Sequence, residues 1–334
     1  MKSLTLGPHI QAKRATHAVT VETVRHLFLL RKVVAASGVL ERFPRLTESV
    51  AYVLAYDALL GEGIRPIGGA ERAVLKCKEI EAELKQAKYR GVQRDPILES
   101  VLLLPAGTDL HDFAPVRDGR AVLQSRASCF PACALAPPRG AKLLDACAAP
   151  GNKTTQLAAA VGPGGRVLAL DKDKRRVQRL RETVDRAGAA SIVETRCDDF
   201  LTLDPAQHAD VEAILLDPSC SGTGTEAGRL DAMLRDGGES AEASELSVAP
   251  EEAERIEALA AFQRRALEHA LSFPGVQRIS YSTCSIHAEE NEMVVQAVEK
   301  VARERGFVLA RALPSWPRRG LPDLDPSQSG AGCI

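Results

Sequence analysis

Apolar residues in the first third of the chain recur every three or four positions. Val21, Val24 and Leu27 show this spacing, and residues 50–59 repeat it. Such spacing places side chains along one face of a helix, whereas strict alternation would indicate a half-buried strand. We therefore predict an α-helical region over residues 17–100, without strands. Breaks between its helices are expected at Gly38, at Pro44 and across the glycine-rich segment 61–70.

From about Lys142 the pattern changes to short apolar segments that alternate with longer amphipathic ones. The expected strands are 141–146, 165–171, 191–196, 211–217 and 277–282. One helix is expected to begin at 154, and three more are expected over 174–187, 250–271 and 289–305. This alternation predicts an α/β fold with a parallel sheet and right-handed crossovers. The acidic, turn-rich segment 236–250 is predicted to be a mobile loop.

Composition adds limits to this picture. The chain has 334 residues and 45% hydrophobic residues, which suits one large domain with a smaller one. No segment approaches 18 consecutive apolar residues, and the start of the chain lacks the pattern of a secretory signal, so we expect an intracellular protein without a membrane span. The eight cysteines contain no C-x-x-C pair, so free thiols are expected and no metal site is indicated.

Charge is uneven along the chain. Residues 1–100 carry 16 Lys or Arg against 11 Asp or Glu, although the net charge of the whole chain is −1. The densest basic segment, residues 76–94, alternates with Glu79, Glu81 and Glu83. We favour a solvated helix face with pairs between positions i and i+4, and a surface that contacts phosphates is the alternative.

The segment "DACAAPGNKT" (145–154) invites comparison with phosphate-binding loops. A nucleotide triphosphatase needs Lys directly after the second Gly of the loop, but Asn152 separates Gly151 from Lys153. The G-x-G-x-x-G pattern of dinucleotide-binding proteins is also missing after this strand. What remains is a strand, a tight turn of small residues and a helix, which together form the ligand-binding turn of an open α/β sheet.

Three acids end three consecutive predicted strands. Asp145 closes the first, Asp171 the second, and Asp199 follows the third. An acid at a strand end is most often a helix N-cap, but the carboxyl ends of parallel strands meet at one edge, where ligands of such sheets bind. Asp171 could accept hydrogen bonds from two ribose hydroxyls and Asp199 from an adenine amine. The set therefore favours S-adenosylmethionine, whose sulfonium cation also suits an acidic rim.

Two cysteines follow the ends of later strands at the same edge. Cys220 lies three residues past Asp217, and Cys284 follows the last predicted strand. A single cysteine in such a place is most often buried and inert. Two of them beside a methyl donor favour covalent activation of a pyrimidine: a thiolate that adds to carbon-6 of cytosine makes carbon-5 nucleophilic.

The segments "DACAAPGNKT", "LDPSCSGTGT" and "YSTCSI" closely resemble the signature motifs of the Nop/Sun (NOL/NOP/Sun) family of RNA cytosine-5 methyltransferases, and Asn152 with "PSCSG" is similar to its large-subunit ribosomal RNA branch. The resemblance covers roughly residues 50–320. It implies a Rossmann-like class I methyltransferase fold, S-adenosylmethionine as cofactor, ribosomal RNA as partner, and a location in the nucleus, at the nucleolus.

The resemblance also implies roles for individual residues. Cys284 would be the nucleophile, and Cys220 would help to release the methylated RNA. Asp217 would protonate or hydrogen-bond the cytosine ring, which Lys153 would orient. The residues expected to line the cofactor and base pocket are Cys147, Ala148, Ala149, Pro150, Gly151, Asn152, Lys153, Asp171, Asp199 and Asp217. Because a thiol must ionise to add to carbon-6, we expect the site to lower the pKa of Cys284.

The chain departs from the family pattern in three places. Ser125 replaces an Asp in "AVLQSRAS", the family's RNA-contacting α/β segment before Pro105 is missing, and so is its last antiparallel strand. The sheet should then have six strands, or leave a gap beside a strand around 307–310. The domains we predict are a mostly helical, RNA-contacting region over 1–115, the methyltransferase domain over 116–320 and an irregular tail over 321–334.

These departures leave a second function open. A ribosome-assembly factor that keeps the cofactor pocket but only binds ribosomal RNA would show the same motifs. A DNA cytosine methyltransferase is disfavoured, because that class places its nucleophile directly after Pro and here Ser219 separates Pro218 from Cys220. We expect a monomer that recognises an unstacked or flipped cytosine in RNA.

Overall fold

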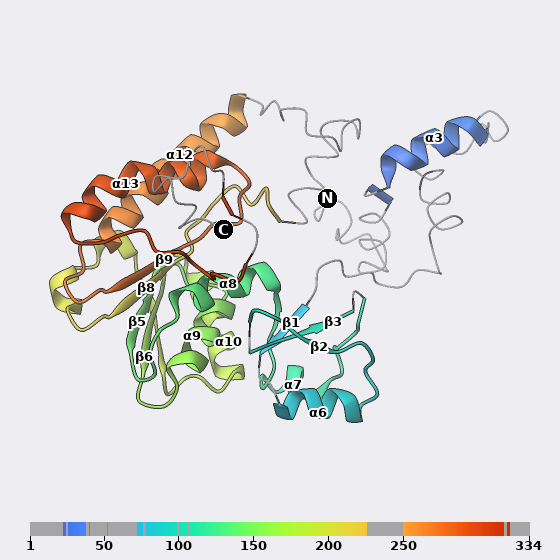
Figure 1. Cartoon of the computed structure of the whole chain (residues 1–334), viewed down its shortest axis with the longest axis horizontal. Helices are drawn as coiled ribbons and strands as arrows, with labels where there is room; N and C mark the ends of the chain where they lie inside the picture. Colours follow the sequence, from blue (N-terminus) through green and yellow to red (C-terminus); the bar gives the residue numbers. More distant parts are fainter. Residues whose placement is uncertain are drawn as a thin grey trace. The chain divides into compact units, whose positions relative to one another are not determined.

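The computed structural model describes residues 23–24, 26–37, 40, 52, 72–75, 78–98, 100–105, 107–225, 250–316 and 319–320. The predicted loop 236–250, except for its last residue, and the predicted tail 321–334 lie outside them. The chain divides into two compact units, and the larger, which consists of 70–105, 109–221 and 249–334, contains both sheets (Figure 1). None of the helices in the described part is both long and apolar enough to cross a membrane.

In the smaller unit, helix α3 (Leu27–Ser37) confirms part of the predicted helical region. Its buried Leu30 and Val34 pack with Tyr52, which gives the unit a small apolar cluster. The predicted helix breaks lie outside the described residues.

An antiparallel sheet precedes the parallel one. It consists of β1 (Arg72–Leu75), β2 (Gln93–Arg94), β3 (Val101–Leu104) and β4 (Leu123–Ser125), in the order β2-β3-β1-β4. The prediction of helices without strands over 17–100 is therefore wrong for β1 and β2. Strand β3 begins one residue after the predicted helical region ends. Strands β2 and β3 are too short to show a period, and the four apolar residues of β3 do not alternate with polar ones.

Helix α6 (Lys78–Gln86) confirms the predicted basic helix. Its Ile80 and Leu84 are buried against Leu102 and Phe113. The charges on its outer face pair within the protein: Glu81 accepts from Lys85 at 2.7 Å and lies 2.8 Å from Arg94, and Glu83 binds Arg120. The expected pair between positions i and i+4 is present. These ion pairs are exposed and contribute at most about 1 kcal/mol each.

The central sheet is parallel throughout, with five strands in the order β7-β6-β5-β8-β9. The strands are β5 (Lys142–Asp145), β6 (Arg166–Asp171), β7 (Val193–Cys197), β8 (Ala213–Leu216) and β9 (Arg278–Tyr281). The helices that flank it are α8 (Arg126–Leu135), α9 (Asn152–Val161), α10 (Lys174–Arg186), α12 (Pro250–Ala270) and α13 (Glu292–Glu304). The predicted elements from 141 onward are confirmed to within three residues. Chain order reverses between β5 and β8, so the ligand crevice is expected at their carboxyl ends.

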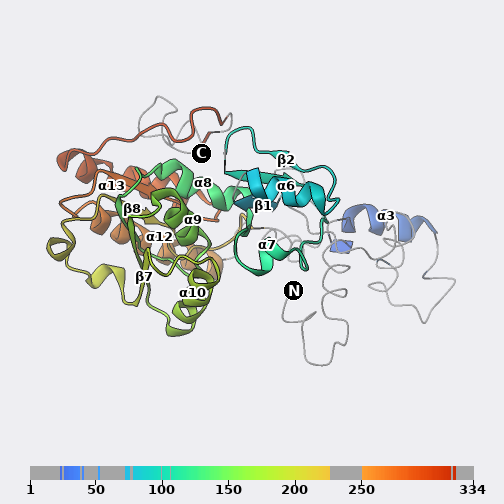
Figure 2. The same ribbon diagram turned by 90° about the horizontal axis from the view of Figure 1, so that it is seen from below.

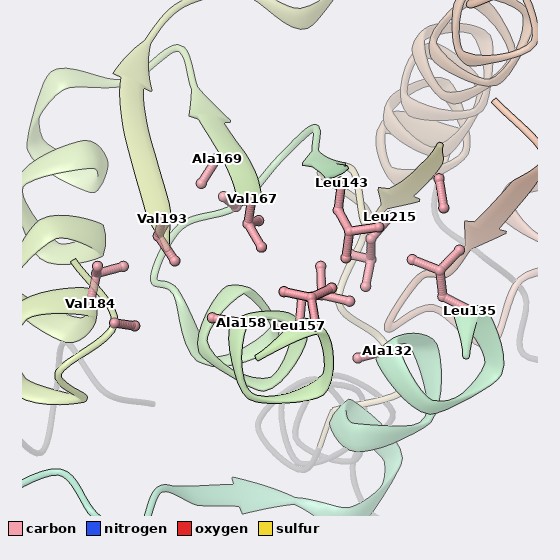
Figure 3. Packing of buried hydrophobic residues seen from close by; sticks show 14 of the residues in the cluster. Ala132, Leu135, Leu143, Leu157, Ala158, Val167, Ala169, Val184, Val193 and Leu215 are labelled. Carbon is pink, nitrogen blue, oxygen red and sulfur yellow. The ribbon is translucent and has the colours of Figure 1, made fainter. Parts of the chain in front are cut away.

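Both faces of this sheet are covered by helices, α9 and α10 on one side and α12 and α13 on the other (Figures 1 and 2). Leu143 packs with Leu157 of α9 on the first side, as Figure 3 shows. Its neighbour Leu144 faces Leu267 of α12 on the second. A fully buried leucine contributes about 1.5–3 kcal/mol by leaving water, so this sandwich holds the strand ends rigidly in place.

The expected sixth strand is not formed. Helix α13 ends at Glu304, and residues 307–312 have no regular structure. Val308 is 84% exposed and Leu309 36% exposed, which is unusual for large apolar side chains. The prediction of six strands, or of a gap beside a strand at 307–310, is therefore wrong for the described residues. A strand needs a partner for its backbone groups, and among the described residues β9 pairs only with β8.

We predict that the backbone amides of Val308–Arg311 exchange their hydrogens rapidly. Within the described residues none of them donates a backbone hydrogen bond, whereas the central strand β5 pairs with β6 on one side and β8 on the other. Hydrogen-exchange mass spectrometry should show rates near those of a free peptide for 308–311 and strong protection for β5, which serves as the control. Strong protection over 308–311 would mean that another segment pairs with this stretch.

Candidate active site

The turn after β5 is tied to both neighbouring strands. The Ala146 amide donates to the Leu215 carbonyl of β8, and the Ala148 amide donates to the Leu170 carbonyl of β6. Gly151 is the N-cap of α9 and has a φ of 107°, and a Cβ at this position would lie 3.0 Å from the side chain of Leu180. Glycine is thus required for the chain to enter the helix here. Burial raises the pKa of the Cys147 thiol to about 12, which disfavours its thiolate form at neutral pH.

Asp145 and Asp171 end neighbouring strands and are almost completely buried. Thr154 donates to Oδ2 of Asp145 at 2.7 Å, while Oδ1 has no hydrogen-bond partner among the described residues. Burial, with the nearby charges of Asp217 and Asp171, raises the pKa of Asp145 to about 7 despite the hydrogen bond from Thr154. Oδ2 of Asp171 likewise accepts no hydrogen bond in the described part, although Arg176 lies 3.3 Å away. Buried carboxylate oxygens of this kind call for a donor from a ligand.

The third acid is partly engaged by the backbone. Asp199 precedes the short helix η1 (Phe200–Thr202), and its Oδ1 accepts from the Leu201 amide at 3.0 Å. The N-cap interpretation is therefore correct for this oxygen. The adjacent Asp198 likewise accepts from one backbone amide, that of Asp199, through its Oδ1, so these contacts do not distinguish the two acids.

Three strand ends converge at Asp217. Lys153 of α9 donates to its Oδ2 at 2.8 Å, and Ser282, which follows β9, donates to its Oδ1 at 2.5 Å. The sequence brought Lys153 and Asp217 to one edge but did not identify Ser282. With both oxygens engaged, the Asp217 carboxylate is fixed between the turn after β5 and the loops after β8 and β9.

The two thiols expected at this edge are in direct contact. Sγ of Cys220 lies 3.1 Å from Sγ of Cys284, and the Cys284 amide lies 3.3 Å from the same Cys220 sulfur. The two cysteines are 64 residues apart in the chain. Their meeting depends on the parallel pairing of β8 with β9, which aligns the loops that follow both strands.

The prediction that the site lowers the pKa of Cys284 is wrong for the protein without bound RNA or cofactor. Its pKa is raised, chiefly by the hydrogen shared with Cys220, then by burial and by the negative charges of Cys220 and Asp217. Lys153 acts in the opposite direction and does not outweigh them. The sequence placed the thiols at one edge but could not show that the two sulfurs would share one hydrogen.

Comparisons with known proteins match the part of the chain that contains these site residues. A family model described as 16S rRNA methyltransferase RsmB/F matches residues 132–306, and one described as the N-terminal domain of NOL1/NOP2/Sun domain family member 5 matches residues 14–96. The chain belongs to the NOL1/NOP2/Sun family of RNA cytosine-5 methyltransferases. The predicted family is thereby confirmed.

Two curated members of this family match almost the whole chain. One is the 25S rRNA (cytosine-C(5))-methyltransferase NSUN5 of Arabidopsis thaliana, with 37% identity over 96% of the chain and 64% of the relative. The other is the 28S rRNA (cytosine-C(5))-methyltransferase of Mus musculus, with 36% identity over 98% of the chain and 82% of the relative. The chain thus spans somewhat less than two thirds of the length of the plant relative.

A solved structure supports the predicted fold. The methyltransferase homolog protein from Pyrococcus horikoshii has a TM-score of 0.53 and 26% identity over 78% of the chain and 81% of that structure. Together with the five parallel strands, this confirms the α/β fold predicted from the alternation of strands and helices and the Rossmann-like class I methyltransferase fold implied by the family resemblance.

One departure from the family pattern has a local explanation. Ser125, which stands in place of the family's Asp, is the N-cap of α8, and its hydroxyl accepts from the Ser128 amide at 3.2 Å. Serine and aspartate are similarly good N-caps. The helix start is therefore retained in this member of the family.

Other polar residues at the site were missed by the sequence reasoning. Glu290, Gln263 and Tyr281 are linked by hydrogen bonds behind the two thiols. The signal that could have found them is the Cys-Ser pair present in both "PSCSG" and "STCSI", since each serine binds this group. Among the described residues, no cluster of three or more His, Cys, Asp or Glu side chains is arranged to hold a metal ion.

Proposed function

We propose that the protein transfers a methyl group from S-adenosylmethionine to carbon-5 of a cytosine in large-subunit ribosomal RNA. The observation that carries this proposal is the contact of Cys220 with Cys284, 3.1 Å apart, beside the Lys153–Asp217 pair. Relatives that match nearly the whole chain are named for this reaction on 25S and 28S rRNA. For a eukaryotic member, such a substrate implies work in the nucleolus.

The residues present fit S-adenosylmethionine, which would supply the methyl group. Oδ2 of Asp171 is buried without a hydrogen bond in the described part, and we assign the ribose hydroxyls to it. Asp199 is assigned the adenine amine, since only one of its oxygens is taken by the backbone. The turn from Cys147 to Lys153 would line the rest of the pocket. Its small side chains give room for the amino-acid part of the cofactor, and the surrounding acids suit a cation rather than phosphates.

The thiol pair provides the covalent step. The Cys284 thiolate forms a bond to carbon-6 of cytosine, and the electrons of the carbon-5 to carbon-6 double bond move into the ring as an enamine. Carbon-5 would then take up the methyl group that bound S-adenosylmethionine would supply. We assign Cys220 as the base of the last step: its thiolate takes the carbon-5 proton, and the electron pair of that bond restores the double bond and expels the Cys284 thiolate.

Asp217 and Lys153 would hold the base. Asp217 is fixed from two sides by Lys153 and Ser282, so it can hydrogen-bond the edge of the cytosine ring in one orientation. The base would enter between the two thiols. Because the hydrogen shared with Cys220 is the main cause of the raised Cys284 pKa, their separation would remove that cause, and the charge of Lys153 would then oppose only burial and the charge of Asp217.

We predict that Asp171→Ala weakens the binding of S-adenosylmethionine by about 1–3 kcal/mol, because the ribose hydroxyls lose charged acceptors. Isothermal titration calorimetry measures this directly. Asp210→Ala, which removes an exposed acid that pairs with Lys142, serves as the control and should bind like the parent. ATP and NAD should not bind either protein. Equal affinity of Asp171→Ala and the parent would show that the ribose lies elsewhere.

Transfer of a tritiated methyl group to ribosomal RNA tests the proposed reaction. Label should appear in the RNA and be recovered as 5-methylcytidine after digestion to nucleosides. A protein that binds the RNA and the cofactor but transfers no label would instead be the non-catalytic assembly factor.

A further inference from the structure

Each of the two thiols is followed in the chain by a serine that binds the same buried carboxylate. The amide of Ser221, next to Cys220, donates to Oε1 and Oε2 of Glu290 at 3.0 and 3.2 Å. Ser285, next to Cys284, binds Glu290 through its side chain, and the two serine hydroxyls lie 3.0 Å apart. Glu290 itself is 0% exposed. One carboxylate therefore joins the loop after β8 to the loop after β9.

A second layer fixes this carboxylate. Gln263 of α12, which is also fully buried, donates to Oε1 of Glu290 and to the Ser219 carbonyl, both at 2.9 Å. The Tyr281 hydroxyl at the end of β9 donates to the main-chain carbonyl of Glu290. Burial would raise the pKa of Glu290, but hydrogen bonds from Ser221, Ser285 and Gln263 outweigh it and hold the pKa below its usual value. Glu290 is therefore ionised at neutral pH.

A buried charge of this kind is costly. All the hydrogen-bond partners of Glu290 in the described part are neutral donors, so no ion pair offsets the loss of hydration. Apolar packing would stabilise the fold as well or better. What a carboxylate adds is several strong hydrogen bonds of fixed direction, which set where the two loop backbones lie.

We propose that Glu290 is a positioning residue that holds the Cys220 and Cys284 loops against each other, so that both thiols face one cytosine. Its effect on catalysis rests on the function proposed above, whereas the positioning of the thiols does not. Glu290→Gln keeps the shape but replaces one acceptor oxygen by a donor. The Ser221 amide, Ser285 and Gln263 would then compete for a single acceptor.

Capture of phenylarsine oxide tests the positioning without any methylation. Its arsenic–oxygen bond is replaced by two arsenic–sulfur bonds, and both thiol protons leave in one water molecule, so tight capture needs two thiols held close together. Cys220→Ala measures the background from other cysteines, such as Cys129 and Cys133 of α8. Glu289→Gln, an exposed acid next to Glu290, is the matched control for the loss of one charge.

We expect Glu290→Gln to weaken capture above background by about tenfold or more, as the loss of a hydrogen bond to a charged group implies. Glu289→Gln should match the parent, and S-adenosylmethionine affinity should stay within about twofold in both. In methyl transfer, kcat should fall with little change in KM for RNA. Parent-like capture by Glu290→Gln, whatever its thermal stability, would overturn the proposal.

Two further results separate the possible failures. If Glu290→Gln does not fold, Ser285→Ala removes only one of the contacts and should weaken capture severalfold, and parent-like capture would again overturn the proposal. If the parent captures the arsenical and Glu290→Gln does not, but neither methylates RNA, then the proposed function has failed and the positioning role stands.

Discussion

Replacement of Cys284 by alanine should abolish methyl transfer. Without the thiolate, carbon-6 gains no bond to the protein and carbon-5 never becomes an enamine carbon, so the expected loss of kcat is on the order of 10⁴-fold or more. No covalent species should form with RNA that contains 5-azacytidine, which traps the thiol adduct. Denaturing gel electrophoresis of protein mixed with labelled RNA measures the adduct.

Cys197→Ala is the control for this substitution. Cys197 is another exposed cysteine, located at the end of β7 and outside the thiol pair. It should methylate RNA and form the adduct like the parent. An adduct in Cys284→Ala would show that the roles of the two cysteines are reversed.

Replacement of Cys220 by alanine should have a different effect. Addition and methylation remain possible because Cys284 is intact, but release of the methylated base is slow. The variant should therefore accumulate a covalent RNA–protein species even with RNA that contains no 5-azacytidine, at least about tenfold above the parent at the same time point. Its turnover should be poor. The species should survive denaturing electrophoresis.

Peptide mapping of the trapped species gives the decisive detail, since the RNA must be attached to the peptide that contains Cys284. A Cys220→Ala variant that turns over freely and accumulates nothing would remove Cys220 from the release step. The 3.1 Å contact would then have no catalytic meaning.

The catalytic sheet was predictable because its pattern is strong. Its strands are apolar and bounded by helices long enough to show their period, so five strands and their order along the chain followed from the sequence. The antiparallel sheet was missed although β1 and β3 have four residues each, like β5, β8 and β9, because no regular alternation of apolar strands with long helices marks this part of the chain. Strands this short are stabilised by their partners rather than by a local pattern.

The site was predictable to the extent that topology determines it. Asp145, Asp171, Asp217, Cys220 and Cys284 were brought to one edge because parallel strands share their direction. Glu290 escaped notice because it belongs to the connection before α13, where an acidic run suggests a solvated surface. The sign of the Cys284 pKa shift depends on a contact between two loops, and no pattern within either loop specifies it.

Bisulfite sequencing of large-subunit ribosomal RNA, from cells that have this protein and from cells that lack it, tests the central claim most directly. Conversion by bisulfite marks every cytosine without a methyl group on carbon-5. We predict a cytosine that resists conversion in the first RNA and is converted in the second, and that is restored by the parent protein but not by Cys284→Ala. If the same cytosines resist conversion in both, the protein does not methylate this RNA.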